Sequence, residues 1–378
     1  MPNVSTRLPQ FPWDRLKPYA ARADAHPGGR VDLSVGTPVD PTPESVRRAL
    51  TAAADAPGYP TTHGTARLRE AASGWMARAL GVSVDPVSVL PLIGSKELVA
   101  GLPALLGTAM GDAVAYPTPA YPTYELGALL AGATPVPVSD RTLTESWIAK
   151  DEAPDNVRLL WLNSPANPHG RVLPAETLRK IVTWARSHGV VVASDECYIT
   201  LGWEGGAPVS VLHPDVCGGT HDGLIAVHSL SKRSNLAGYR AAFLSGDPAL
   251  VAELLEVRKH AGMMMPAPVQ AATAAALDDD EDAAAQKERY RSRRVVLREA
   301  LEAADFRVDH SEAGLYLWAS RLAEGKPEPC WDTIAYLAGL GILAAPGEFY
   351  GLGGEHHVRV ALTATDERVA AAAARLAG

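Results

Sequence analysis

Four short apolar runs, each followed at once by a polar motif, constrain the fold of this chain more than any other feature. The runs are residues 90–93, 159–162, 190–193 and 224–227. We expect each run to be a strand buried in a mostly parallel sheet, because such strands read as nearly continuous apolar segments. The motifs then lie at the C-terminal ends of the strands, where open α/β sheets bind their ligands.

The motifs supply an amine, a carboxylate, an amide, a phenol, hydroxyls and a guanidinium. These are the groups that can hold pyridoxal phosphate as a Schiff base. In chain order the motifs are Gly94-Ser95-Lys96-Glu97, Asn167-Pro168-His169-Gly170, Asp195-Glu196-Cys197-Tyr198 and Ser229-Leu230-Ser231-Lys232, the last with Arg240 eight residues on.

Length and composition limit the class of protein. A chain of 378 residues favours two domains. The net charge of -8 argues against non-specific nucleic-acid binding, and the uncharged runs 98–111 and 126–139 are too short and too interrupted to span a membrane. The three cysteines have no metal-type spacing, which favours a reduced protein. The N-terminus has no apolar core of a signal peptide, so we expect the protein to be cytoplasmic.

Helical patterns alternate with the apolar runs, which predicts βαβ units. We predict an N-terminal arm and part of a small domain at 1–45, a large cofactor-binding domain at 46–265, and a small α+β domain at 266–378. The arm is expected to be extended, and the acidic run 278–282 to be a solvated loop before a helix at 283–303. The other expected helices are 66–80, 96–106, 121–131, 175–188 and 248–259.

The first and last motifs favour a phosphate site and a reactive lysine. The turn before a helix at Ser95 and Lys96 presents free backbone N–H groups to an anion, although tight turns also use Gly-Ser for geometry alone. Lys232 must lose a proton to form a Schiff base, and Arg240 and Arg233 nearby favour that loss; a surface lysine is the alternative.

The remaining candidates surround a cofactor ring. Asp195 would pair with a protonated ring nitrogen, or would simply cap the next helix. Asn167 and Tyr198 could bind the phenolic oxygen of the ring, and Tyr121 could stack on it; turn formation and core packing are the alternatives. Arg359 lies in an apolar segment and needs an anion, either a substrate carboxylate or an internal salt bridge.

Together and in this order, the motifs resemble the fold-type I pyridoxal-phosphate aminotransferases of the class I/II group. The resemblance runs from residues 33–36 to residues 358–362. It implies an α/β fold with a mostly parallel central sheet between helices, plus a smaller α+β domain. It also implies that pyridoxal 5′-phosphate is held by Ser95, Lys96, Tyr121, Asn167, Asp195, Tyr198, Ser229, Lys232 and Arg240.

The resemblance further implies amino-acid and keto-acid substrates and a homodimer with shared active sites. Gly36, Asn167 and Arg359 match the substrate-carboxylate contacts, and Tyr59 matches the tyrosine that reaches the phosphate of the partner subunit. His169 departs from the family, which usually has threonine there. No histidine spacing matches a metal motif, so we expect no metal.

Within the group, residues 228–240 and 262–266 look most like actinobacterial succinyldiaminopimelate aminotransferases. This implies ping-pong transfer between glutamate and N-succinyl-2-amino-6-oxopimelate, with Lys232 moving the proton. An aromatic or aspartate-like aminotransferase and a C–S lyase remain alternatives, whereas a DNA-binding regulator is disfavoured by the short arm. Candidate cations for the distal carboxylates of the acceptor are Lys17, Arg30, Arg67, Lys96 and Arg233.

Overall fold

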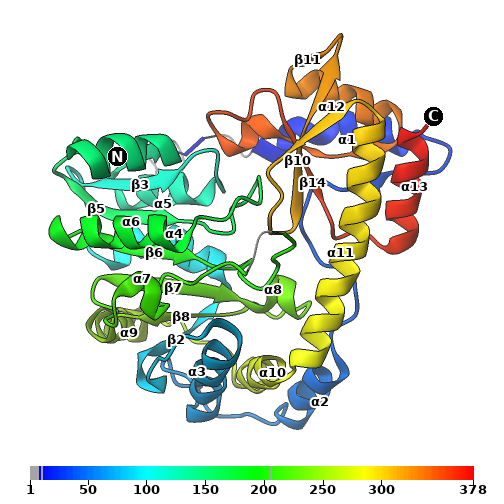
Figure 1. Ribbon diagram of the computed structural model, residues 1–378. Coiled ribbons are helices and arrows are strands. Elements are labelled where there is room, and N and C mark those ends of the chain that lie inside the picture. Colours follow the sequence, from blue (N-terminus) through cyan, green and yellow to red (C-terminus); the bar gives the residue numbers. More distant parts are fainter. Residues whose placement is uncertain (1–7, 10–11, 205–206) are drawn as a thin grey trace, which may run out of the picture.

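A seven-stranded sheet forms the centre of the larger part of the molecule (Figure 1). The structure is a computed structural model that describes residues 8–9, 12–204 and 207–378. The strand order is β2-β8-β7-β6-β5-β3-β4, and β8 runs antiparallel to both neighbours while the other pairs are parallel. The strands are β2 (Val89–Ile93), β3 (Ala113–Pro117), β4 (Thr134–Val138), β5 (Val157–Leu162), β6 (Val191–Asp195), β7 (Leu224–Ser229) and β8 (Ala241–Gly246).

Helices bury both faces of this sheet, which explains the unbroken apolar runs. Along β5, Leu159 and Trp161 join one core cluster, whereas Leu160 and Leu162 join the other, because successive side chains point to opposite faces. The first cluster includes side chains of α4 (Ser95–Leu105), α5 (Thr123–Ala131) and α9 (Pro248–Ala261). The second includes side chains of α3 (Ala66–Leu80), α6 (Ala175–Ser187) and α10 (Ala267–Asp278).

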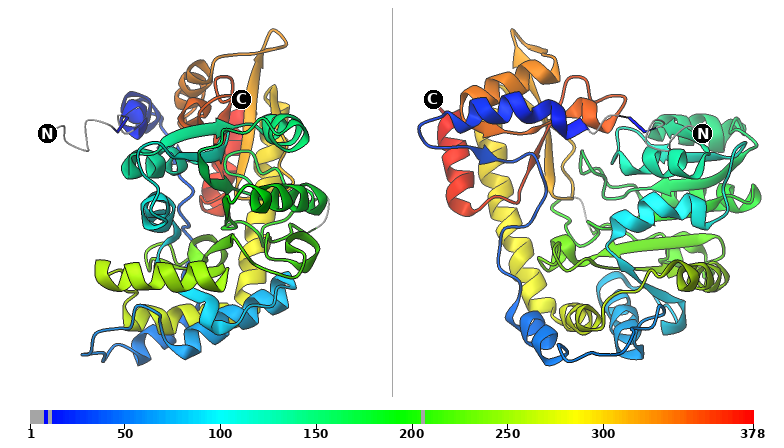
Figure 2. Two further views of the ribbon diagram at one scale, coloured as in Figure 1. Left: turned by 90° about the vertical axis from the view of Figure 1, so that its left-hand side faces the viewer. Right: turned by 180° about the vertical axis from the view of Figure 1, so that it is seen from behind.

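A smaller part is built from both ends of the chain. Leu16, Val31 and Leu33 share one core with residues after 290, and β1 pairs in parallel with β12. In Figure 2, α1 near the N-terminus lies along α12. The elements are α1 (Lys17–Asp24), β1 (Val31–Asp32), β9 (Phe306–Asp309), β10 (Tyr316–Ala323), β11 (Lys326–Pro327), α12 (Cys330–Gly339), β12 (Ile342–Leu343), β13 (Ala345–Pro346), β14 (Val358–Ala361) and α13 (Asp366–Leu376).

The two parts are joined by α11 (Asp280–Ala303), the long helix at the right of Figure 1. This helix has 24 residues and is rich in charged side chains. Across the parts of the chain that the structure describes, no helix combines the length and the apolar character that a membrane span requires. The remaining short elements are η2 (Pro12–Leu16), α2 (Glu44–Ala52), η3 (Pro86–Ser88), η4 (Thr142–Ile148), α7 (Pro214–Cys217), α8 (Leu230–Arg233) and η5 (Gly347–Tyr350).

Three details differ from the sequence-based expectation. The arm is not wholly extended, since residues 17–24 form α1, with a proline in its first turn, where the missing N–H is tolerated. Residues 267–278, which we expected in the small domain, form α10 and pack against α2 and α3. The acidic run is not a loop: Asp279 caps α11 by accepting a hydrogen bond from the backbone N–H of Asp282, and acids in a first turn stabilise the helix dipole.

A buried ion-pair network fixes the N-terminal segment to α11. The guanidinium of Arg293 is 3% exposed and binds Asp40 at 2.6 Å and Asp366 at 2.7 Å. Burial alone would raise the pKa of Asp40, but hydrogen bonds from Arg293 and Gln286 lower it below its usual value. The carboxylate therefore contributes stability near neutral pH that is lost as the pH falls through its lowered pKa.

We expect Arg293→Ala to lower the free energy of unfolding by about 3 kcal/mol, because it leaves Asp40 largely buried without its cation. Lys180→Ala is the matched control, since its pair with Glu176 is exposed and should contribute less than about 1 kcal/mol. Urea unfolding of both variants measures the difference. Equal losses in the two variants would contradict the assignment.

Candidate active site

Lys232 lies in α8, directly after β7, and its side chain reaches across to the N-terminal segment. Its amino group donates a hydrogen bond to the carbonyl oxygen of Gly36, which brings the N-terminal segment over the sheet. Burial lowers the pKa of Lys232; the neighbouring Tyr316 opposes that shift, and the charges of Arg359 and Arg240 add to it. A lysine with a lowered pKa is a better nucleophile at neutral pH.

Asp195 ends β6, the strand that pairs with β7, and its side chain is buried. Its carboxylate accepts hydrogen bonds from the hydroxyl of Tyr124 at 2.8 Å and from the backbone N–H of Cys197 at 3.2 Å. Burial raises the pKa of Asp195, and these hydrogen bonds only partly oppose the rise. A cationic partner such as a protonated ring nitrogen would restore the charged form.

Arg359 of β14 and Asn167 of the loop after β5 form a second group of buried side chains. Arg359 is 4% exposed and donates to the side-chain oxygen of Asn167 at 3.0 Å and to the carbonyl of Ser34 at 2.8 Å. Within the described residues no acidic side chain forms an ion pair with it, and its Nε has no hydrogen-bond partner. The internal salt bridge that the sequence left open is therefore not formed, and the guanidinium is available to an anion.

A candidate anion site lies where α4 begins. Gly94 has φ 81°, and a Cβ there would overlap the guanidinium of Arg240, which lies against this turn. The first backbone N–H groups of a helix, here those of Ser95 and Lys96, have no partner within the helix. Ser229 caps α8 nearby and accepts from the backbone N–H of Ser231 at 3.2 Å.

The tyrosines occupy different positions. Tyr198 is buried, and its hydroxyl lies 3.3 Å from that of Tyr316. Tyr121 packs edge-on against Tyr124 at 5.9 Å, and burial raises its pKa to about 12. Tyr59 is 97% exposed, so its predicted contact with a partner subunit is not tested within one chain.

Three residues of the site escape the sequence analysis. Tyr124, in the first turn of α5, donates a hydrogen bond to Asp195. The sequence signal that could have identified it is its position three residues after Tyr121. Asn163 donates to the carbonyl of Asp195 at 2.9 Å and accepts from the backbone N–H of Asn167 at 2.7 Å. Tyr316 comes from β10, far away in the sequence, and no local pattern marks it.

The cations proposed for distal carboxylates are mostly engaged elsewhere. Arg233 is buried and pairs with Asp280 at 2.9 Å instead of facing the site. The side chain of Lys96 is exposed, so only its backbone N–H is placed at the anion site. The other three pair with acids of the same chain: Lys17 with Asp14, Arg30 with Asp24, and Arg67 with Asp278.

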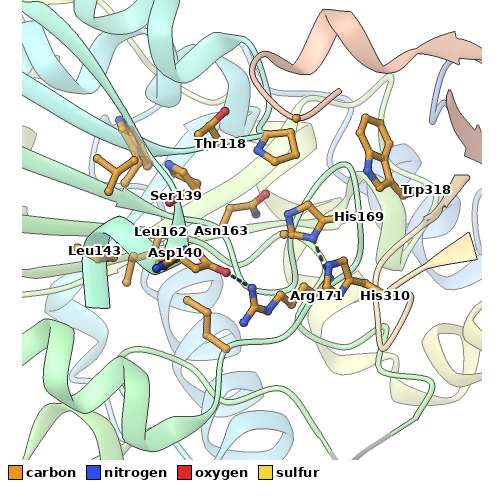
Figure 3. A pocket seen from close by; sticks show the side chains of 18 of the residues that line it. Thr118, Ser139, Asp140, Leu143, Leu162, Asn163, His169, Arg171, His310 and Trp318 are labelled. Carbon is orange, nitrogen blue, oxygen red and sulfur yellow. Dashed lines mark hydrogen bonds and ion pairs between the residues drawn. The ribbon is translucent and has the colours of Figure 1, made fainter. Parts of the chain in front are cut away.

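A cavity of about 350 Å³ adjoins the site on the far side of Asn163 (Figure 3). The rings of His169 and His310 pack against one another in its wall with their centroids 5.3 Å apart, and Arg171 pairs there with Asp140 at 2.6 Å. Burial lowers the pKa of His169 to about 3, so this ring is neutral. Among the residues that the structure describes, no three His, Cys, Asp or Glu side chains are placed to hold a metal ion.

The donor set fits pyridoxal phosphate. A helix N-terminus with an arginine suits a phosphate, a buried carboxylate suits a pyridinium nitrogen, and a buried lysine of lowered pKa suits a Schiff base. All lie at the C-terminal edge of a mostly parallel sheet between helices. Fold and site together define a pyridoxal-phosphate enzyme of fold type I.

Comparison with known proteins places the chain within that class. Residues 29–376 match the family "Aminotransferase class I and II", to which the chain therefore belongs. It is 60% identical to 4-dedimethylamino-4-oxo-anhydrotetracycline transaminase OxyQ of Streptomyces rimosus, over 98% of this chain and 99% of that protein. It is also 60% identical to the probable aminotransferase Rv1178 of Mycobacterium tuberculosis, over 99% of this chain and 86% of that protein.

A solved structure agrees with the fold. The N-succinyldiaminopimelate aminotransferase of Mycobacterium tuberculosis is 26% identical and superposes with a TM-score of 0.86, covering 100% of this chain and 99% of that one. The predicted fold class is thus confirmed, and the chain is a pyridoxal-phosphate-dependent aminotransferase.

The glycine at the anion site gives a direct test of phosphate binding. We expect Gly94→Ala to weaken pyridoxal phosphate binding by about 10-fold or more, because the new Cβ displaces Arg240 and removes a charge-assisted hydrogen bond. Absorbance titration of the apoenzyme with the cofactor measures this.

Gly107→Ala is the matched control. Gly107 also has a positive φ, 75°, but a Cβ there meets nothing within 4 Å. Both variants place a side chain at a positive φ, at a cost on the order of 1–3 kcal/mol each, whereas only Gly94→Ala also displaces Arg240. Equal cofactor affinities in the two variants would contradict the assignment of Arg240 to the phosphate.

Proposed function

We propose that this aminotransferase takes the amino group of glutamate and transfers it to a keto acceptor, with N-succinyl-2-amino-6-oxopimelate as the first candidate. The observation that carries the amino-acid part is the buried guanidinium of Arg359, which has a free Nε and no acidic partner among the described residues. A planar fork of this kind matches an α-carboxylate.

The residues divide the work of one half-reaction. Arg359 binds the α-carboxylate, with Asn167 and Gly36 at its side, and so orients the substrate amine toward Lys232. The bound cofactor supplies an electron sink for the substrate's α carbon. Lys232 would remove the proton from that carbon as general base and later return a proton as general acid. Asp195 keeps the ring nitrogen protonated throughout.

Three observations bear on the identity of the acceptor. The likeness to an N-succinyldiaminopimelate aminotransferase supports the acyclic keto acid. The pairing of Arg67 and Arg233 with acids of the same chain leaves few free cations for an acceptor with three carboxylates. A second candidate is a polycyclic ketone of the anhydrotetracycline type, which the 60% identity to OxyQ favours.

The acceptor can be identified in the second half-reaction. We expect the glutamate-treated enzyme to regain the absorbance of its starting form when N-succinyl-2-amino-6-oxopimelate is added, because the acceptor takes the stored amino group. If only the polycyclic ketone restores the starting absorbance, the second candidate is the acceptor. Recovery with neither would contradict both acceptors and leave the glutamate reaction intact.

We expect the reaction with glutamate to require an arginine at position 359. We expect Arg359→Lys to reduce kcat/KM for glutamate on the order of 100-fold, because an ammonium cannot form the paired hydrogen bonds of a guanidinium. Production of 2-oxoglutarate in single turnover measures this and separates transamination from C–S lyase chemistry. Lys180→Ala, on the exposed surface of α6, is the control and should react as the wild type does. A wild-type rate in Arg359→Lys would contradict the carboxylate site.

We further propose that the enzyme is a homodimer in which Tyr59 reaches the phosphate site of the partner subunit. A tyrosine that is 97% exposed leaves a large apolar surface in water, and a partner subunit would cover it. Closed two-fold dimers are the commonest assembly of soluble enzymes.

Subunit mixing tests this arrangement. Tyr59→Phe should weaken cofactor binding, and Lys232→Ala should abolish transamination, because each removes one part of every site. At a cofactor concentration that leaves Tyr59→Phe mostly unloaded, a refolded equimolar mixture of the two variants should regain activity on the order of one quarter of the wild type, since half of the dimers are mixed and each has one complete site. No recovery, in mixtures shown to contain mixed dimers, would contradict a shared site.

A further inference from the structure

Tyr316 is the first residue of β10 and lies at the centre of the site without an assigned role. The guanidinium of Arg359 lies over its ring at 3.8 Å, and its hydroxyl is 3.3 Å from the hydroxyl of Tyr198. Gly36 must be a glycine here, because a Cβ would overlap the hydroxyl of Tyr316. The carbonyl of that same glycine accepts the hydrogen bond from Lys232.

We propose that Tyr316 is a positioning residue of the transamination site that donates a hydrogen bond to Tyr198 and thereby makes Tyr198 a stronger donor to the cofactor's phenolic oxygen. The inference rests on the proposed cofactor contacts of Tyr198 and Lys232. A hydroxyl that accepts one hydrogen bond while it donates another is polarised, and such chains strengthen one another.

Either hydroxyl of the pair can donate, and we assign the donor to Tyr316 because the guanidinium of Arg359 lies over its ring at 3.8 Å and favours loss of its proton. Burial by itself would raise its pKa, but the charges of Arg359 and Lys232 lower the pKa below the usual tyrosine value. The pKa of Tyr198 is instead raised well above that value, by burial first and then by Tyr316. The more acidic phenol is the better donor. The titratable groups that act on Tyr316 or feel its charge are Arg359, Lys232, Tyr198, Cys197, Tyr350, Tyr121 and Tyr290.

Removal of the hydroxyl has a defined effect on the bound cofactor. Without Tyr316 as donor, Tyr198 stabilises negative charge on the phenolic oxygen less well. The nitrogen that joins Lys232 to the cofactor then holds its proton more strongly. The pH at which the absorbance of the bound cofactor changes should therefore rise.

Tyr316→Phe tests this while it keeps the ring under Arg359. We expect the midpoint of the cofactor's absorbance titration to rise by about half a pH unit or more, in the same direction as in Tyr198→Phe but by less. The double variant should shift no further than Tyr198→Phe alone, because Tyr316 acts through Tyr198. Tyr336→Phe is the matched control, since its ring also lies under an arginine, Arg321 at 3.7 Å, but on the α12 surface.

The apoenzyme provides a readout that needs no cofactor. Its ultraviolet titration should show a phenol that ionises below the usual tyrosine range and disappears in Tyr316→Phe but not in Tyr336→Phe. An unchanged cofactor midpoint in Tyr316→Phe, or fully additive shifts in the double variant, would overturn the proposal. If the wild type instead fails to bind the cofactor or to react with glutamate, the proposed function fails, and the phenol titration still tests Tyr316 alone.

Discussion

The arrangement of the two parts of this molecule depends on the hydrogen bonds of the Arg359 guanidinium. It is buried where the two parts of the chain meet, and it is held by an oxygen of Asn167 from the loop after β5 and by the carbonyl of Ser34 from the N-terminal segment. A buried cation without an acidic partner is costly unless oxygen atoms and an anion compensate it. In the proposed function that anion is the carboxylate of the substrate, which would complete the contact between the two parts.

The cofactor residues follow from the sheet. Parallel strands bring their carboxyl ends to one edge, so Asp195 at the end of β6 and Lys232 just after β7 become neighbours although 36 residues separate them. Antiparallel β8 returns the chain so that Arg240, just before it, reaches the turn at Gly94. A few hydrogen bonds, such as that of Tyr124 to Asp195, then fix the side chains.

Much of this could be predicted because strands buried on both faces leave a clear apolar pattern, and each one ended in a polar motif. Helix α3 was predicted with its observed bounds for the same reason, since its caps, Thr65 and Gly81, are explicit. What could not be predicted depends on distant contacts. Tyr316 and Asn163 enter the site through tertiary packing. Helix α10 belongs to the larger part because it packs against α2 and α3, and its Ala-rich sequence gives no sign of these contacts. The pairing of Arg233 with Asp280 likewise required the fold of α11 to be known.

The most direct test of the account is to find the lysine that binds the cofactor. The purified holoenzyme would be reduced with borohydride and digested, and the peptides would be analysed by mass spectrometry. We predict a phosphopyridoxyl group on Lys232 alone, because this lysine is buried, has a lowered pKa and faces the candidate cofactor site. A label on Lys96 or on another surface lysine, with none on Lys232, would contradict the central claim.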